Sequence, residues 1–428
     1  MSPRRVELGL RENLAQFSLL LAVNAFVGAM VGLERSTLPL IGEDDFGLGS
    51  STAVLSFIVA FGVAKALTNL AAGSLATRVG RRRLLIVGWG LALPVPLLIA
   101  VAPTWAVVVA ANALLGINQG LAWSMTVVMK IDLVGPRRRG FALGLNEAVG
   151  YGGVALAAAA SGWLAADFAP RDVVVVAGAV IALVALVLSI VFVRDTGGHV
   201  ALEQHQSTDP DDARAPSLRE ALIDASWRRP DLRACSQAGL VNNLNDALAW
   251  GLVPLYLAAN GASVGAIGLV AGIYPAVWGL AQIGTGAWSD RVGRKPLIVA
   301  GMLLQAAALG LLAVGGGAVG TAVAASVILG LGTALVYPTL IAAISDHVSP
   351  VARAAVVGVY RFWRDSGYVV GGLLAGIGAD VLGFGGAIAV VAGLTAASGI
   401  WVALDLDRQR RPLEREAPCV DSAVVGHG

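Results

Sequence analysis

Long apolar stretches alternate along the chain with short charged ones, and this alternation predicts membrane-spanning helices. A helix rises about 1.5 Å per residue, so about 20 apolar residues are needed to cross a hydrocarbon core of about 30 Å. The run from Val173 to Val193 is one such stretch. The pattern predicts an all-α integral membrane protein with twelve transmembrane helices, at 15–41, 52–76, 84–102, 105–129, 140–166, 172–193, 233–259, 264–288, 297–315, 318–345, 353–380 and 384–404.

The composition identifies lipid as the solvent for most of the surface. Hydrophobic residues make up 57% of the 428 residues, and charged residues make up only 14%. The mean hydropathy is +0.75. These values argue against a water-soluble protein, whose surface needs more charge. The 54 glycines suit helices that pack closely in a bilayer, where small residues let backbones approach.

Lys and Arg residues are distributed unevenly over the predicted loops. They gather in both tails, in the loops 78–83, 137–139 and 291–295 and in the long middle loop, whereas Arg171 stands alone on the other side. Membrane proteins keep such positive charge on the cytoplasmic side. The bias predicts a multi-pass protein of a bacterial-type cytoplasmic (inner) membrane with both termini in the cytoplasm. The first span is expected to be retained, because no small-residue cleavage site marks a signal peptide.

The two halves of the chain repeat one another at an offset of 213 to 215 residues. Such a repeat indicates duplication of a structural unit. Because each half has an even number of spans, both halves enter the membrane in the same orientation, and binding is expected at their interface. The prediction is two pseudo-symmetric six-helix bundles at 1–193 and 233–404, a cytoplasmic linker at 194–232 and a disordered cytoplasmic tail at 405–428. Within the repeat, Asp132, Pro136, Arg139 and Gly144 return as Asp346, Pro350, Arg353 and Gly358, and Pro39 returns as Pro254.

One repeated loop carries the motif Gly-x-x-x-Asp-Arg-x-Gly-Arg-Arg/Lys. The second copy holds every position, whereas the first has Thr77 in place of the acid. With this motif the chain resembles the major facilitator superfamily of secondary transporters over nearly its whole length. The resemblance implies a cytoplasmic gate in which Asp290 serves and the first copy departs from the family pattern; the alternative is that the arginines only anchor the topology. The expected gating residues are Gly73, Arg78, Gly80, Arg81, Gly286, Asp290, Arg291, Gly293 and Arg294.

The fifth predicted span bears on the branch of the family. Drug/proton antiporters that resemble this chain carry Gly-Pro followed by paired glycines there. Here the span contains Gly144 and the paired glycines Gly152 and Gly153, without Gly-Pro. The resemblance to drug/proton antiporters is therefore incomplete.

Eight charged residues lie inside predicted spans. Each would cost about 2.5–3.5 kcal/mol at the bilayer centre on insertion scales, so they are expected to face protein or water. They avoid the spans that are peripheral in the resembling family, which points to a central cavity. The eight are Glu34, Arg35, Lys65, Glu147, Asp246, Arg361, Arg364 and Asp365.

The repeat suggests how some of these charges pair. Glu147 and Arg361 are equivalent positions, so a salt bridge across the pseudo-axis is expected, and Glu147 is a candidate coupling residue. Arg361 and Asp365 stand at i and i+4, which favours a local pair and leaves Arg364 to hold an anionic substrate group. Lys65 either contacts substrate or pairs with Glu34 or Asp246.

Asp246 is the strongest candidate for binding a ligand or a proton, because Asn242, Asn243 and Asn245 precede it within one turn and suit a wet cavity. Glu34 and Arg35 lie nearer the outer end, so an outer-gate role is as plausible as binding. Further polar and aromatic side chains are expected to line the cavity. They are Asn24, Asn118, Gln119 and Gln282, with Trp123, Tyr274, Tyr337 and Tyr360 as aromatic walls.

The leading hypothesis is a secondary active transporter of a small solute that works by alternating access, coupled to protons through carboxylates and expected to export. All four histidines lie outside the spans, and the chain has no Walker loop, metal-ligand cluster or nucleophile-base pair, so we expect neither an enzyme nor a cofactor. The alternatives are an organic-anion carrier that uses Lys65, Arg361 and Arg364, and a non-transporting membrane sensor or scaffold. The expected partners are a small-molecule substrate, protons and the lipid bilayer, without nucleic acid, and the expected state is a monomer.

Overall fold

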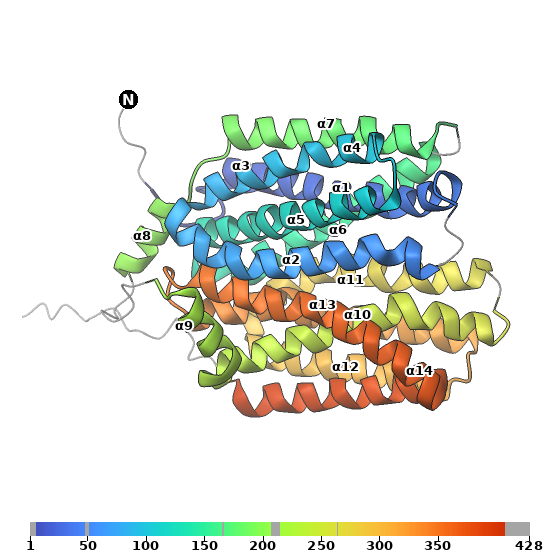
Figure 1. Ribbon diagram of the computed structural model, residues 1–428. Helices are drawn as coiled ribbons and strands as arrows, with labels where there is room; N and C mark the ends of the chain where they lie inside the picture. The colour runs from blue at the N-terminus through green and yellow to red at the C-terminus, as the bar shows by residue number, and fades with distance from the viewer. Residues whose placement is uncertain (1–5, 48–50, 165–166, 207–214, 263, 407–428) are drawn as a thin grey trace, which may run out of the picture.

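Two helical bundles lie side by side in the structure, a computed structural model that describes residues 6–47, 51–164, 167–206, 215–262 and 264–406. Figure 1 shows α1–α7 as the upper bundle and α10–α14 as the lower one. The first bundle contains α1 (Leu14–Asp44), α2 (Ser51–Val79), α3 (Arg81–Ala92), α4 (Pro94–Ala100), α5 (Trp105–Val134), α6 (Arg139–Leu164) and α7 (Pro170–Val191). The second contains α10 (Pro230–Ala259), α11 (Val264–Val292), α12 (Arg294–Val314), α13 (Val319–His347) and α14 (Arg353–Asp405).

The helices provide two sets of six membrane spans. Nine helical stretches among the described residues are long and apolar enough to cross a bilayer. One of them combines α3 and α4, and another is α14, which contains two spans because Gly383 interrupts its helical backbone with a φ of 72°. The 30-residue α10 and the 29-residue α11 complete the twelve. The all-α membrane fold predicted from hydropathy is thus confirmed.

The segment between the bundles contains short helices. Helix α9 (Leu218–Ile223) begins with a capping box between Ser217 and Glu220 and is followed by the π-helix η3 (Asp224–Arg228). An additional helix, α8 (Gly197–Gln206), precedes it and buries Val200 and Glu203. Figure 1 shows α8 and α9 at one end of the bundles, which is called the linker end below.

The bundles meet along two helix pairs, α2 with α14 and α6 with α11. Small residues permit both contacts: a Cβ atom on Gly73 would overlap the carbonyl oxygen of Ala354, and one on Gly286 would overlap that of Gly140. All four residues lie in the half of the bundles that ends at the linker. The glycine of each motif copy therefore lets the two halves close there.

Candidate functional site

Asp290 of the second motif copy joins the two bundles at the linker end. Its carboxylate accepts hydrogen bonds from the backbone N–H groups of Gly140 (2.9 Å) and Phe141 (3.0 Å), which begin α6 in the other bundle. A carboxylate is favoured at this position because it caps unpaired N–H groups and complements the helix dipole. Arg294 anchors Asp290 at 2.7 Å and also donates to Asp346 at 2.9 Å.

The first motif copy is built differently. Thr77 donates its hydroxyl hydrogen to the carbonyl of Ser74 in its own helix, so it does not reproduce the contact of Asp290. Arg81 lies 3.5 Å from Asp132, and Asp132 also accepts a hydrogen bond from Arg353 of the second bundle at 3.1 Å. In this half the bundles are connected through Asp132 and Arg353.

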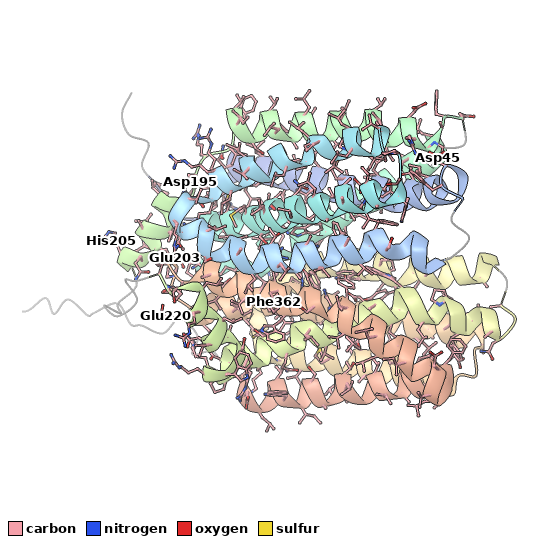
Figure 2. The ribbon with its side chains drawn as sticks, in the orientation of Figure 1. Asp45, Asp195, Glu203, His205, Glu220 and Phe362 are labelled. Carbon is pink, nitrogen blue, oxygen red and sulfur yellow. The ribbon has the colours of Figure 1, made fainter. Side chains whose placement is uncertain are left out.

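A linker residue connects both copies. Glu203 of α8 accepts hydrogen bonds from Arg139 of the first bundle and from Arg353 of the second, the latter at 2.7 Å. Arg139 also donates to Asp346 at 2.8 Å. Figure 2 shows Glu203 at the linker end, where the two bundles meet. The linker thus closes a network of buried charges that spans both halves; this network is called the linker-end gate below.

Sequence reasoning did not assign a role to the buried charges of this gate outside the motif. Asp132, Arg139, Asp346 and Arg353 were recognised only as markers of the repeat. Their return at one offset was the available signal, because charges repeated at helix ends suggest a shared structural role. Glu203 carried no such signal, since it stands in a polar linker without a counterpart.

The first arginine of each motif copy lies outside this network. Arg78 and Arg291 are exposed, and among the described residues neither forms an ion pair. Gly80 and Gly293 have φ values of 95° and 98° and precede α3 and α12, so both tight turns require glycine. Of the predicted gating arginines, only Arg81 and Arg294 belong to the buried network.

Deeper between the bundles, Glu147 and Arg361 form the pair that the repeat predicts. Their carboxylate and guanidinium groups lie 3.8 Å apart, and both side chains are fully buried. Glu147 also accepts hydrogen bonds from the Trp123 indole (3.2 Å) and the Asn146 amide (2.7 Å). Arg361 donates to Ser124 at 3.4 Å.

The expected local pair between Arg361 and Asp365 is wrong. Arg364 instead donates two hydrogen bonds to Asp365, at 2.8 and 2.6 Å, and Asn69 of the first bundle donates to its other oxygen at 2.6 Å. Arg361 is directed to Glu147 because a carboxylate of the other bundle lies opposite it. Arg364 keeps Nη1 without a hydrogen-bond partner among the described residues, and its guanidinium lies 5.2 Å from the Tyr337 ring centroid.

Two lysines belong to the same region. Lys65 is half-buried, and its ammonium lies 5.3 Å from the Trp123 ring centroid and interacts electrostatically with Asp365. Lys130 is buried and donates to the carbonyl of Leu20 at 3.0 Å. The sequence reading missed Lys130 because it ended the fourth span at residue 129. Its position seven residues after Trp123, on the same helix face, was the available signal.

Asp246 faces the aromatic side chains of its own bundle. It accepts hydrogen bonds from the hydroxyl groups of Tyr274 and Tyr368, the latter at 3.4 Å. Tyr274 also shares a hydrogen bond of 3.2 Å with Thr333. The Tyr151 ring of the first bundle packs on Trp278 with centroids 4.4 Å apart. Asp246 is therefore connected through Tyr274 and Trp278 to Tyr151 of the first bundle.

The expectation that Asn242 and Asn245 share a cavity with Asp246 is wrong. Asn242 accepts a hydrogen bond from Gln305 of α12 at 3.0 Å, and Asn245 donates to the same residue at 2.8 Å. Asn245 also accepts from Thr395 in the second part of α14 at 2.8 Å. Both amides connect α10 to helices of its own bundle. Buried amides need hydrogen-bond partners in place of water, and these helices supply them.

Asn24 and Gln119 likewise connect helices within the first bundle. Asn24 donates to the carbonyl of Asn146 and accepts from Thr126, at 2.8 and 2.9 Å. Gln119 donates to the carbonyl of Val27 at 2.8 Å. The expectation that they line the central cavity is replaced by a packing role. Glu34 is buried beside Asn112 in the same bundle, whereas the Arg35 side chain lies outside the described residues.

Comparisons with known proteins agree with this architecture. The family model of the Major Facilitator Superfamily matches residues 14–230 and 236–421. Three solved structures share the fold at low identity. The human organic anion transporter MFSD10 (TETRAN) is 16% identical with a TM-score of 0.71, and the match covers 90% of this chain and 98% of that chain. The Escherichia coli fucose:proton symporter FucP is 15% identical with a TM-score of 0.71 and coverages of 90% and 97%; the proton:xylose symporter XylE bound to 6-bromo-6-deoxy-D-glucose is 14% identical with a TM-score of 0.70 and coverages of 92% and 97%. With two six-span bundles and a family match over nearly its whole length, the chain belongs to the Major Facilitator Superfamily and is a membrane transporter, not an enzyme.

Proposed function

We propose that the chain is a secondary transporter of a small organic anion, which binds between the bundles at Arg361 and Arg364. The observation that carries this proposal is a pair of buried guanidinium N–H groups without hydrogen-bond partners in the described part of the chain: Nε of Arg361 and Nη1 of Arg364. Such donors are costly to bury unless an acceptor arrives. A carboxylate or phosphate would satisfy them with matching geometry.

A further basic side chain near these arginines supports the same substrate class. The ammonium of Lys65 lies 5.3 Å from the ring centroid of Trp123, and Trp123 hydrogen-bonds Glu147, the partner of Arg361. A cation in this position attracts a bound anion. One of the structures with the same fold is an organic anion transporter, and this likeness is consistent with the proposal.

The test is substrate flux into proteoliposomes with a panel of aromatic carboxylates, sugar acids, neutral sugars and quaternary amines. Arg364→Gln is expected to abolish uptake of the preferred anion, while Arg364→Lys keeps part of it. The matched control is Arg233→Gln, which removes an arginine that pairs with Asp405 and lies outside the proposed site. Preference for cations or neutral solutes would overturn the anion proposal. Binding without flux for every solute would favour a sensor or scaffold.

Proton coupling through Glu147 is a second candidate, favoured by one specific observation. Oε2 of Glu147 has no hydrogen-bond partner among the described residues, although the group is buried and faces Arg361 of the other bundle. A proton on Glu147 would weaken this contact between the halves, which links protonation to rocking. Flux under an imposed pH gradient tests it: the parent is expected to respond and Glu147→Gln is not. Gradient-insensitive flux in the parent would contradict coupling.

The distribution of arginines supports one orientation of the chain in the membrane. We propose that the linker end faces the cytoplasm of a bacterial-type inner membrane, because the arginine-rich loops lie there, and that the chain works as a monomer. Export is the proposed direction. Reversing the pH gradient across oriented proteoliposomes separates export from import. The orientation is tested with a cysteine placed at Arg78 or at Asp45, which a membrane-impermeant thiol reagent labels only from the side where it is exposed.

A further inference from the structure

Gln282 of α11 is a buried amide in the interface between the bundles. The side chain is fully buried, yet neither Nε2 nor Oε1 has a hydrogen-bond partner among the described residues. A Cβ atom on Gly144 of α6 would overlap the carbonyl oxygen of Gln282, and Trp278, one turn earlier in α11, packs its ring on Tyr151 of α6. Glu147 stands between Gly144 and Tyr151 along α6. Gln282 is therefore at the level of the central charges.

The repeat supplies a matched amide in the first bundle, and that amide is satisfied. Asn69 of α2 corresponds to Gln282 at the offset of 213 residues. Its backbone has the equivalent contact, because a Cβ atom on Gly358 of α14 would overlap the carbonyl oxygen of Asn69. The Asn69 side chain donates to Asp365 and accepts from Ser124, both at 2.6 Å. The fold thus directs an amide at this position toward the space between the bundles.

The partner that satisfies the first amide has no equivalent beside the second. Asp365 corresponds to Tyr151 at the offset of 214 residues, and the Tyr151 hydroxyl shares a hydrogen bond of 3.2 Å with Tyr337. The indole Nε1 of Trp278 also has no hydrogen-bond partner in the described part of the chain. A group that satisfies both atoms of the Gln282 amide must donate and accept a hydrogen bond, as a hydroxyl does.

Aromatic rings connect this amide to the proposed anion site. The Tyr337 ring centroid lies 5.2 Å from the Arg364 guanidinium and 5.1 Å from the Trp278 ring centroid. Tyr151 belongs to the first bundle, whereas Tyr337, Trp278 and Arg364 belong to the second. Separation of the bundles during transport would therefore uncover these ring faces together with the guanidinium. Flat ring faces favour an aromatic ligand.

We propose that the transported anion is an aromatic carboxylate with a hydroxyl group on its ring, and that Gln282 selects this hydroxyl. The inference rests on the proposed function, because it places the carboxylate at Arg361 and Arg364. The ring of the ligand lies against Tyr337 and Trp278. The hydroxyl donates to Oε1 of Gln282 and accepts from Nε2, which gives both buried atoms a partner.

Calorimetric titration of the full chain in phosphatidylcholine nanodiscs at neutral pH tests the proposal with four ligands. They are 4-hydroxycinnamate, cinnamate and the carboxamide of each acid, and empty nanodiscs correct for partition into lipid. Acids compared with carboxamides test the anion site, and hydroxylated ligands compared with plain ones test Gln282. The parent is expected to bind 4-hydroxycinnamate about tenfold more tightly than cinnamate.

Two variants are expected to remove one preference each. Gln282→Leu weakens 4-hydroxycinnamate about tenfold and leaves cinnamate unchanged. Arg364→Gln removes the preference for acids over carboxamides and keeps the preference for the hydroxyl. The matched control is Gln237→Leu, which removes an amide that accepts a hydrogen bond from Ser398 within the second bundle. It should alter neither preference.

The outcomes separate this inference from the proposed anion transport. Equal binding of hydroxylated and plain ligands by the parent would overturn the role of Gln282 and indicate that water satisfies it. A hydroxyl preference that survives Gln282→Leu, in protein with an unchanged melting temperature, would overturn it as well. Acids that bind no better than carboxamides, with the hydroxyl preference intact, would contradict the anion site and support Gln282 as the selector. Binding of none of the four ligands would overturn the aromatic substrate.

Discussion

The two motif copies occupy equivalent positions at the linker end, yet they hold the bundles together with different acids. The second copy uses its own Asp290, which caps α6 of the opposite bundle. The first copy has Thr77, which bonds within its own helix. Around them the pairs remain symmetric, because Asp132 receives Arg353 as Asp346 receives Arg139.

The linker supplies acids where the first copy lacks one. Asp195 accepts the backbone N–H of Arg82 at 3.0 Å near the start of α3, and Glu203 joins Arg139 to Arg353. In the first half, carboxylates of the linker thus take contacts at the helix ends where the motif copy has no acid. The difference also makes the first half of the gate dependent on the docking of α8. Variants in the linker and in the two motif copies test this difference.

Glu203→Ala is expected to cause the largest loss, about 3–5 kcal/mol, because it leaves Arg139 and Arg353 buried with one anion fewer. Thermal unfolding of the purified protein measures the loss, and hydrogen exchange at the starts of α6 and α14 is expected to rise. His205→Ala, an exposed neighbour on α8, is the control and should change little. An equal effect of both variants would contradict the bridging role of Glu203.

Asp290→Ala is expected to destabilise the closed gate by about 2–3 kcal/mol, since it removes a helix cap and one partner of Arg294. The matched control is Thr77→Ala at the equivalent position, with an expected change below about 0.5 kcal/mol. Melting temperatures of the two variants give the comparison. If the two losses were similar, the copies would not differ in the way described above.

Thr77→Asp is expected to stabilise the first half of the gate by about 0.5–1 kcal/mol. Thr77 lies one turn from Gly73, which contacts Ala354 at the start of α14, so an aspartate would reach the first-turn N–H groups there as Asp290 does in α6. The restored symmetry should also reduce the cost of Glu203→Ala. A double-mutant cycle measures this coupling, and strictly additive effects would exclude it.

The smallest effect concerns His199 of α8, whose imidazole lies 3.1 Å from the side chain of Asn13. Burial lowers the pKa of His199 below 6.5, with Asp132 acting in the opposite direction. The neutral form is favoured in the docked linker, so its contribution is present above pH 6.5 and is lost as the pH falls through the lowered pKa. Hydrogen exchange of α8 should rise slightly on acidification, and His199→Gln should remove that dependence.

Much of the fold followed from the sequence because lipid imposes strict rules on it. Span lengths, the repeat and the motif glycines are one-dimensional patterns, and each predicted its structural counterpart. Lys130 was missed because hydropathy alone cannot place a span end to within one residue. Asn242 and Asn245 were misassigned because a polar helix face does not reveal which neighbouring helix satisfies it.

Hydropathy, the internal repeat and the distribution of arginines were sufficient to predict a membrane protein with two related six-helix bundles and repeated arginine-rich loops. Of the charge pairs, only Glu147 with Arg361 could be read from the repeat; the pairing of Arg364 with Asp365 and of Glu203 with an arginine from each bundle required the folded structure. The physical reason is that burial in lipid requires each charge to find a partner, whereas the choice of partner depends on which helix faces lie opposite one another.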